Sequence, residues 1–164
     1  MSNLKNTPKT GGGIIDLNRA QIEHRAAWMA LMYEEAEKDG FDIEEATRRA
    51  IKRMGNFHGA LFKTSLGDSY EFDNFKNVFF NGLVIKTFEM DKFETTEDEL
   101  KVEFNYCPLL TAWQKLGVSD EKCSKLCDIA MDGDRGIAEV LGYKLELTDT
   151  IASGCNSCKM RFYK

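Results

Sequence analysis

The chain has 164 residues, of which 43% are hydrophobic and 30% charged, and its net charge is -5. This size and balance are typical of a globular domain that can bury a core without disulfide bonds. The absence of a basic cluster argues against nucleic-acid binding. No apolar run approaches the roughly 20 residues of a membrane span, and the N-terminus has no apolar signal segment. We therefore expect a cytoplasmic protein with free thiols.

The N-terminal half carries helical signals. Residues 1–13 are polar and end in three glycines, so we predict a flexible tail there and a single domain over 14–164. Asp16 can begin a helix that runs to about Lys38. The stretch 42–45 resembles a capping box and predicts a second helix, which Gly55 is expected to end. The aromatic-rich stretch 56–81 is also expected to be helical.

The pattern changes in the C-terminal half. Residues 83–91 are rich in β-forming types, and residues 100–106 alternate between apolar and polar, which predicts two strands. Helices are expected over 109–116, 119–131 and 135–141. Residues 143–147 and 158–162 alternate again, which predicts two more strands. The expected fold is therefore α+β, with N-terminal helices followed by an antiparallel four-stranded meander-type sheet that has helices packed on one face.

Cys155 and Cys158 form a Cys-x-x-Cys pair near the C-terminus. A zinc site needs about four ligands. Cys107 and Cys127 could complete one, although the cysteine spacing is not that of two zinc-binding pairs, so zinc remains an alternative. A redox pair of the thioredoxin type would precede a helix, and here a strand is expected to follow.

Cys107 stands where a strand is expected to give way to a helix, just before Pro108. A thiol near a helix N-terminus can be an activated nucleophile, and the alternative is a cysteine that only packs. His58 could act as a general base or could be structural.

Three aspartates cluster in the segment 128–139, next to Arg135. Clustered carboxylates can position water or a cation. Asp134 can also cap the following helix. Arg135 could bind a substrate carboxylate through two hydrogen bonds.

The segments 104–117, 126–142 and 149–162 together resemble the L-2-amino-thiazoline-4-carboxylic acid hydrolase family. Cys107 matches the family's strand-ending cysteine, and Asp134 is the best match for its helical aspartate, with Asp128 and Asp132 as rivals. Thr150, Ile151 and Gly154 match a turn, and the closing strand is matched by Cys158, Arg161 and Phe162. Lys159 stands where the family pattern has Asp, and Met160 stands where it has Phe. A more distant likeness is to vinyl-reductase-type domains and trafficking-particle subunits.

This resemblance implies a hydrolase that uses water to open a small cyclic amidine or thiazoline ring, with a small-molecule substrate and no cofactor. The candidate catalytic residues are Cys107, Asp134, Cys158 and His58, and the candidate substrate-binding residues are Arg135, Arg161 and Thr150. Two alternatives stay open: a small-molecule or cofactor-binding module, and a metal-binding protein that uses Cys107, Cys127, Cys155 and Cys158. No nucleic-acid or membrane partner is expected, and a homo-oligomer is left open.

Overall fold

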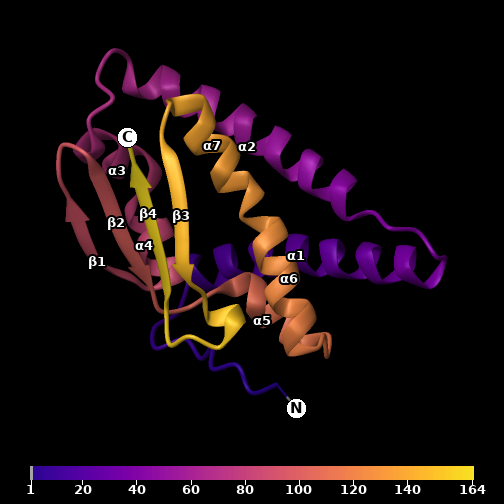
Figure 1. Cartoon of the computed structure of the whole chain (residues 1–164). Coiled ribbons are helices and arrows are strands. Elements are labelled where there is room, and N and C mark those ends of the chain that lie inside the picture. Colours follow the sequence, from indigo (N-terminus) through magenta and orange to yellow (C-terminus); the bar gives the residue numbers. More distant parts are fainter. Residues whose placement is uncertain (1) are drawn as a thin grey trace.

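A four-stranded antiparallel sheet holds the C-terminal half of the chain together (Figure 1). The computed structural model describes residues 2–164. The helices are α1 (Ile14–Lys38), α2 (Glu44–Leu66), α3 (Phe72–Phe79), α4 (Gly82–Phe88), α5 (Pro108–Lys115), α6 (Asp120–Ala130) and α7 (Asp132–Leu141), with a short 3-10 helix η1 (Ile151–Ser153). The strands are β1 (Met90–Thr95), β2 (Glu99–Phe104), β3 (Lys144–Asp149) and β4 (Cys158–Tyr163). The predicted α+β class is confirmed.

The strand order is β1-β2-β4-β3. A simple meander would place each strand beside the next one in the sequence. Here β4 pairs antiparallel with both β2 and β3, so the last strand of the chain is internal and β3 is an edge strand. The start of β4 therefore lies beside the end of β2, where Phe104 pairs with Cys158.

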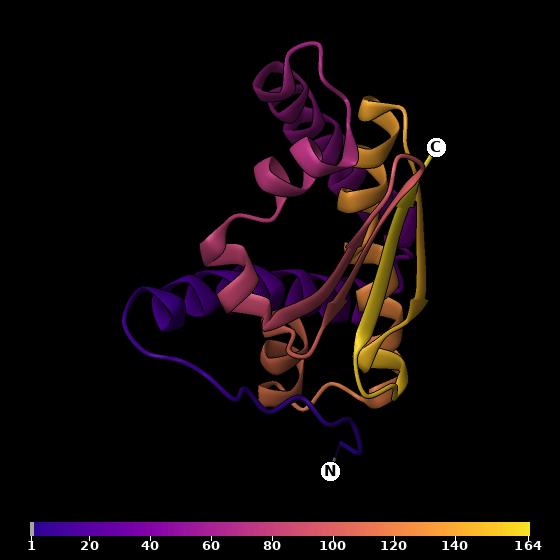
Figure 2. The same cartoon turned by 90° about the vertical axis from the view of Figure 1, so that its left-hand side faces the viewer.

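The two central strands have one buried and one solvent-facing side, as their alternation predicted. On β2, Leu100 and Val102 are buried, and on β4 Met160 and Phe162 are buried. The opposite side carries charged pairs such as Lys101 with Glu99. Figure 2, in which the sheet is seen almost edge-on, shows the helices gathered on one side of it.

Helices α2 and α7 lie side by side in unusually close contact (Figure 1). A Cβ atom added to Gly55 would meet the carbonyl oxygen of Gly133 at 2.0 Å, and one added to Gly136 would meet that of Lys52 at 2.5 Å. The prediction that Gly55 ends its helix is wrong, because α2 continues to Leu66. Gly55 instead allows the two backbones to touch, which places the rest of α2 against α7.

A second difference from the sequence-based expectation concerns residues 83–91. Their β-forming side chains predicted a strand, but residues 82–88 form α4, and β1 begins only at Met90. Asn81 caps this helix, because its side-chain oxygen accepts hydrogen bonds from the backbone N–H groups of Leu83 and Val84 at 3.1 Å. Local capping and packing therefore outweigh the intrinsic preference of these residues.

Residues 2–13 contain no helix or strand but are docked along the protein. Asn6 is buried, with 8% of its surface exposed. Glu89 accepts hydrogen bonds from the backbone N–H groups of Lys9 at 2.7 Å and Thr10 at 2.8 Å. The same carboxylate pairs with buried Arg19 at 3.2 Å. The segment predicted as a tail thus has specific partners on α1, α5 and the turn before β1.

Among residues 2–164, no helix combines the length and the apolar character that crossing a membrane would need.

The α2–α7 contact gives a first prediction. Replacing Gly55 with alanine should force the helices apart and lower the free energy of unfolding by about 2–3 kcal/mol, because an added methyl group has no room beside the Gly133 carbonyl. Gly82→Ala is the matched control, since a Cβ there meets no atom within 4 Å. Urea unfolding of both variants tests this, and equal stabilities would contradict it.

Candidate functional site

Two adjoining cavities with shared lining residues lie on the helical side of the sheet. The inner cavity, of about 380 Å³, is lined by residues of all four strands and of helices α1 to α7. The outer cavity, of about 690 Å³, lies between α1, α2 and the start of α7. Six residues line both cavities and define what we call the junction: Arg25, His58, Leu109, Ala130, Asp134 and Ile137.

The inner cavity is mainly aromatic and aliphatic. Its aromatic side chains are Phe62, Phe79, Phe80, Phe88, Phe104 and Trp113. The indole N–H of Trp113 donates a hydrogen bond to the carbonyl of Ala26 at 3.0 Å, so its polar group is already satisfied. Three thiols, those of Cys107, Cys127 and Cys158, also face this space.

Cys107 occupies the strand-to-helix position that the sequence indicated. It is the N-cap residue of α5, with an extended backbone, and Pro108 begins the helix. Burial has the largest influence on the thiol of Cys107 and raises its pKa. The backbone N–H groups of Leu110 and Leu109 act to lower the same pKa, but by less. The thiol is therefore the resting form at neutral pH, and a nucleophilic role would require a base.

The other two cavity thiols are also protonated. Burial raises the pKa of Cys158 to about 12, and the nearby Cys107 adds to this effect. Burial likewise raises the pKa of Cys127, with further contributions from Cys107 and Cys158. The backbone N–H of Ile151 donates to the Cys158 sulfur at 3.3 Å. Strand pairing and the α6 face thus bring three thiols to one cavity, where Cys158 is buried and Cys107 and Cys127 are half-buried.

Asp134 lies in the first turn of α7 and lines both cavities. Burial raises its pKa to about 6, although the positive charge of Arg25 acts to lower it. A carboxyl group with this pKa is mostly ionised at neutral pH yet basic enough to accept a proton, which is the property expected of a general base. The structure places it with His58, whose helix α2 is held against α7 by the glycine contact.

Arg25 is a site residue that the sequence reasoning missed. It lies on α1 and lines both cavities, close enough for its charge to lower the pKa of Asp134 and of Cys107. No carboxylate among the described residues lies within ion-pair distance of it. It is exposed and stands beside Ala26, a member of the buried stripe of α1, so the sequence offered no signal for it.

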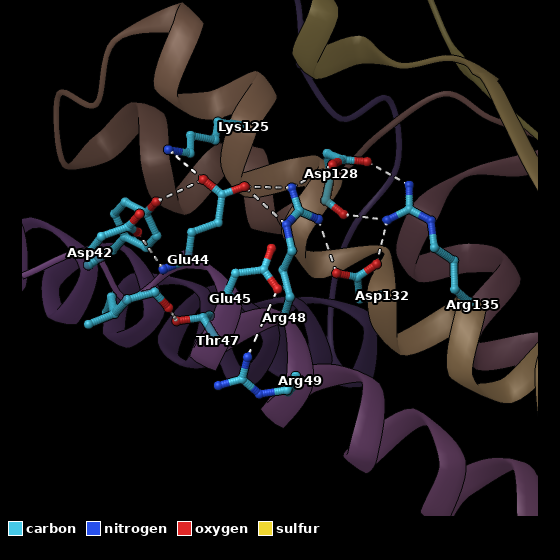
Figure 3. Close-up of polar contacts among 12 residues, drawn as sticks. Asp42, Glu44, Glu45, Thr47, Arg48, Arg49, Lys125, Asp128, Asp132 and Arg135 are labelled. Atoms are coloured by element: carbon cyan, nitrogen blue, oxygen red, sulfur yellow. Dashed lines mark hydrogen bonds and ion pairs between the residues drawn. The ribbon is translucent and has the colours of Figure 1, made fainter.

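Arg135 belongs to an ion-pair network and lies outside both cavity linings. Its guanidinium pairs with Asp128 and Asp132, each at 2.6 Å. Arg48 of α2 pairs with the same two aspartates at 2.7 and 3.0 Å (Figure 3). Partial burial of Asp128 acts to raise the pKa of its carboxyl group. Hydrogen bonds from Arg135 and Arg48 outweigh this effect and keep the pKa below its usual value. The predicted role of Arg135 in holding a substrate carboxylate therefore has no support from its position, because its charge is already neutralised.

Two more predicted binding residues lie away from the cavities. Arg161 is on the solvent side of the sheet, where it pairs with Glu99 at 2.6 Å and Glu146 at 3.0 Å. Thr150 caps η1, accepting a hydrogen bond from the backbone N–H of Ser153 at 3.0 Å. Strand alternation explains the first case, since Arg161 must face opposite to Met160 and Phe162.

The alternative zinc site is not assembled. Among residues 2–164, no three side chains of the His, Cys, Asp or Glu type converge in a way that could hold a metal ion. Cys107, Cys127 and Cys158 line the inner cavity, whereas Cys155 lies in the turn outside it. The Cys-x-x-Cys spacing thus does not bring its two thiols into one site.

The N-terminal segment fixes the backbone of Cys107. The Asn6 side-chain oxygen accepts a hydrogen bond from the Cys107 N–H at 2.9 Å, and its amide group donates to the Cys107 carbonyl at 2.8 Å. The same amide donates to the Thr111 hydroxyl at 2.9 Å. Asn6 therefore determines how the strand end turns into α5, and with it the direction of the thiol.

The pKa of Asp134 leads to a stability prediction. Its folded-state pKa of about 6 lies above the ordinary 3.8, so the folded protein loses stability as pH rises between these values and does not regain it above them. Asp134→Asn should therefore stabilise the protein at pH 7.5, by about 3 kcal/mol at most, and have little effect near pH 4. Asp132→Asn is the control of opposite sign, because it breaks two ion pairs. Denaturant unfolding of both variants at pH 7.5 and near pH 4 measures these changes in the free energy of unfolding. Destabilisation by Asp134→Asn at pH 7.5 would refute this prediction.

The Asn6 contacts lead to a further prediction. Asn6→Asp keeps the acceptor for the Cys107 N–H but loses both donor bonds, so we expect a loss of about 1–3 kcal/mol of stability. The thiol of Cys107 should also react about tenfold faster with a maleimide, measured by peptide mapping, since roughly 1.4 kcal/mol of lost restraint corresponds to that factor. Asn3→Ala is the control from the same segment, because only its backbone N–H is bonded, to Asp120. Identical labelling rates in the two variants would contradict a role for Asn6.

No curated protein sequence matches the chain closely enough to count as a relative. Among solved structures, the fold is similar to that of trafficking protein particle complex subunit 3 from Naegleria fowleri, which was solved covalently bound to palmitic acid. That similarity has a TM-score of 0.53 at 15% sequence identity and covers 88% of this chain and 95% of the other. It concerns the fold alone.

The family model for L-2-amino-thiazoline-4-carboxylic acid hydrolase matches residues 19–162, which is nearly the whole described fold and extends well beyond the C-terminal segments that carried the resemblance. The match includes α1 with Arg25, α2 with His58, the Cys107 junction and α7 with Asp134. The chain belongs to the L-2-amino-thiazoline-4-carboxylic acid hydrolase family.

Proposed function

We propose that the protein is a hydrolase that opens a small cyclic amidine or thiazoline ring bearing a carboxylate. The observation that supports this most directly is that a basic carboxylate, Asp134, and a cation without an ion-pair partner among the described residues, Arg25, both line the junction. A substrate with an amidine and a carboxylate presents the complementary charges. The family membership agrees with this reaction class.

The proposed roles follow from position and charge. Arg25 binds the substrate carboxylate, since a guanidinium donates to both oxygens. Asp134 accepts a proton from the water that attacks the amidine carbon. His58, on the facing helix, shuttles protons between water and the leaving group. The thiols of Cys107 and Cys158 line the reacting ring.

The reaction balances with water as the only co-reactant. The water oxygen forms a bond to the amidine carbon and becomes a carbonyl oxygen, while the bond from that carbon to sulfur breaks. One proton passes to the departing sulfur and the other to the ring nitrogen, which gives an N-carbamoyl thiol. Cys107→Ser shows whether the thiol participates. Turnover lost in that variant would make Cys107 a nucleophile whose proton Asp134 takes, and retained turnover would leave it as part of the lining.

The first test is turnover of L-2-amino-thiazoline-4-carboxylate, followed by thiol release and product mass. We expect kcat/KM to rise with pH around pH 6, where Asp134 ionises, and to fall about 10²–10⁴-fold in Asp134→Asn. Arg25→Gln should mainly raise KM, whereas Arg53→Gln, at an exposed arginine of α2 that lines neither cavity, is the matched control. The proposal fails if neither the thiazoline nor its imidazoline and oxazoline analogues are hydrolysed.

A second candidate function is binding of an apolar small molecule without turnover. The aromatic inner cavity with its protonated thiols favours it, and the structurally similar trafficking subunit carries palmitic acid. Mass spectrometry of the purified protein, before and after organic extraction and hydroxylamine treatment, would reveal a retained or thioester-linked ligand. Stoichiometric retained ligand without hydrolysis of the thiazoline would favour this candidate.

A further inference from the structure

Polar and apolar groups are divided between the two cavities in a way that limits where a charged ligand group can bind. The charged side chains that line the inner cavity, Arg25 and Asp134, are both at the junction, where the outer cavity also reaches them. Beyond the junction the inner lining is aromatic and aliphatic, apart from Asn81 and three protonated thiols. Moving an unpaired charge past the junction would be costly, so a charged head group must stay at Arg25.

Within the described part of the chain, no buried side-chain nitrogen or oxygen atom of the inner-cavity lining lacks a hydrogen bond. The oxygen of Asn81 is occupied in capping α4, and the indole N–H of Trp113 is bonded to a backbone carbonyl. Among the described residues, the buried side-chain atoms without a hydrogen bond are an oxygen of Glu89 and one of Asp120, and neither residue lines this cavity. What fills the inner cavity is therefore apolar.

Size supports the same conclusion. A space of about 380 Å³ lies within the range of pockets that hold a drug-sized molecule. A carboxylate-bearing ring held at the junction would leave most of it empty. The aromatic wall, in which Phe62, Phe79 and Phe80 meet edge to face, offers both ring edges and ring faces to a ligand.

We propose that the site takes a carboxylate ligand whose apolar body passes Ala130 and fills the inner cavity. The hydrolase substrate is then a cyclic amidine carboxylate that carries an apolar substituent. This inference rests on the proposed function, because it names the substrate class of the same site. Ala130, the last residue of α6, lines both cavities and is the smallest side chain of the junction, so a larger residue there would obstruct a ligand that extends from one cavity into the other.

The test uses Trp113 as a reporter of inner-cavity binding. Trp113 is buried in this lining, whereas Trp28 is 62% exposed on α1, so Trp28→Phe leaves a single internal fluorophore. In this background, butyrate, hexanoate, octanoate and 4-phenylbutyrate are titrated at pH 7.5. Affinity should rise about fourfold for each added methylene, the factor expected for burying one such group.

Two variants locate the binding. Ala130→Phe should remove the gain of octanoate and 4-phenylbutyrate over butyrate, and Ala130→Leu gives the same test if the larger side chain prevents folding, which thermal melting will show. Ala46→Phe, which lines only the outer cavity, is the control and should leave the gain intact. An affinity independent of chain length, or a gain that survives both Ala130 variants, would overturn the inference.

The binding and turnover readouts fail separately. If affinity rises with carboxylate chain length but no cyclic amidine is hydrolysed, the proposed hydrolase activity is wrong and the proposed ligand class stands. If the unsubstituted thiazoline is hydrolysed but affinity does not rise with chain length, the ligand class is wrong and the hydrolase activity stands. When both hold, thiazolines with propyl and benzyl groups on the exocyclic nitrogen should show kcat/KM at least tenfold above that of the unsubstituted ring.

Discussion

The direct backbone contact between α2 and α7 is the constraint on which the candidate site depends. It exists because Gly55 and Gly136 have no side chains where the two helices touch. His58 lies one turn beyond Gly55 on α2, and Asp134 lies between Gly133 and Gly136 on α7. Bringing the two backbones together therefore also brings these two side chains to the junction. The ion pairs of Arg48 with Asp128 and Asp132 reinforce the same packing near the start of α2.

Charge is distributed in the molecule according to this geometry. The carboxylates of Asp128 and Asp132 are neutralised by two arginines, whereas Asp134, on the same stretch of chain, faces the cavity and is partly deprived of water. Closely spaced aspartates thus acquire different properties, two as structural ion-pair partners and one as a group that can exchange a proton. The direction in which each side chain leaves the α6–α7 corner decides whether an aspartate joins the ion pairs or faces the cavity.

The departures of this chain from the family pattern are separated by the sheet. Lys159 is on the solvent side, paired with Asp149 at 2.6 Å, so its identity alters an outer-face ion pair and leaves the cavity carboxylate in place. Met160 is on the inner side and lines the inner cavity. A flexible thioether where the pattern has a phenyl ring changes the shape of that cavity. The chain therefore differs from the family pattern in the part of the site that would hold the apolar portion of a ligand.

Local patterns in the sequence determined much of the fold, and tertiary packing decided the site. Alternation was sufficient for β2 and β4, the flanking Pro108 and Gly117 were sufficient for α5, and the Ser119 cap was sufficient for α6, because these signals act within a few residues. Periodicity could not show that Gly55 continues a helix or that 83–88 is helical, because an opposing helix and a side-chain cap decide those cases. Cys107 and Asp134, which line the inner cavity, could be proposed from motif and position. Arg25 could not, because α1 becomes a neighbour of these groups only when the helices pack, and no local signal encodes a contact across roughly a hundred residues. Ala130 stands only one helical turn before Asp134, but its methyl group carries no chemical signal in the sequence.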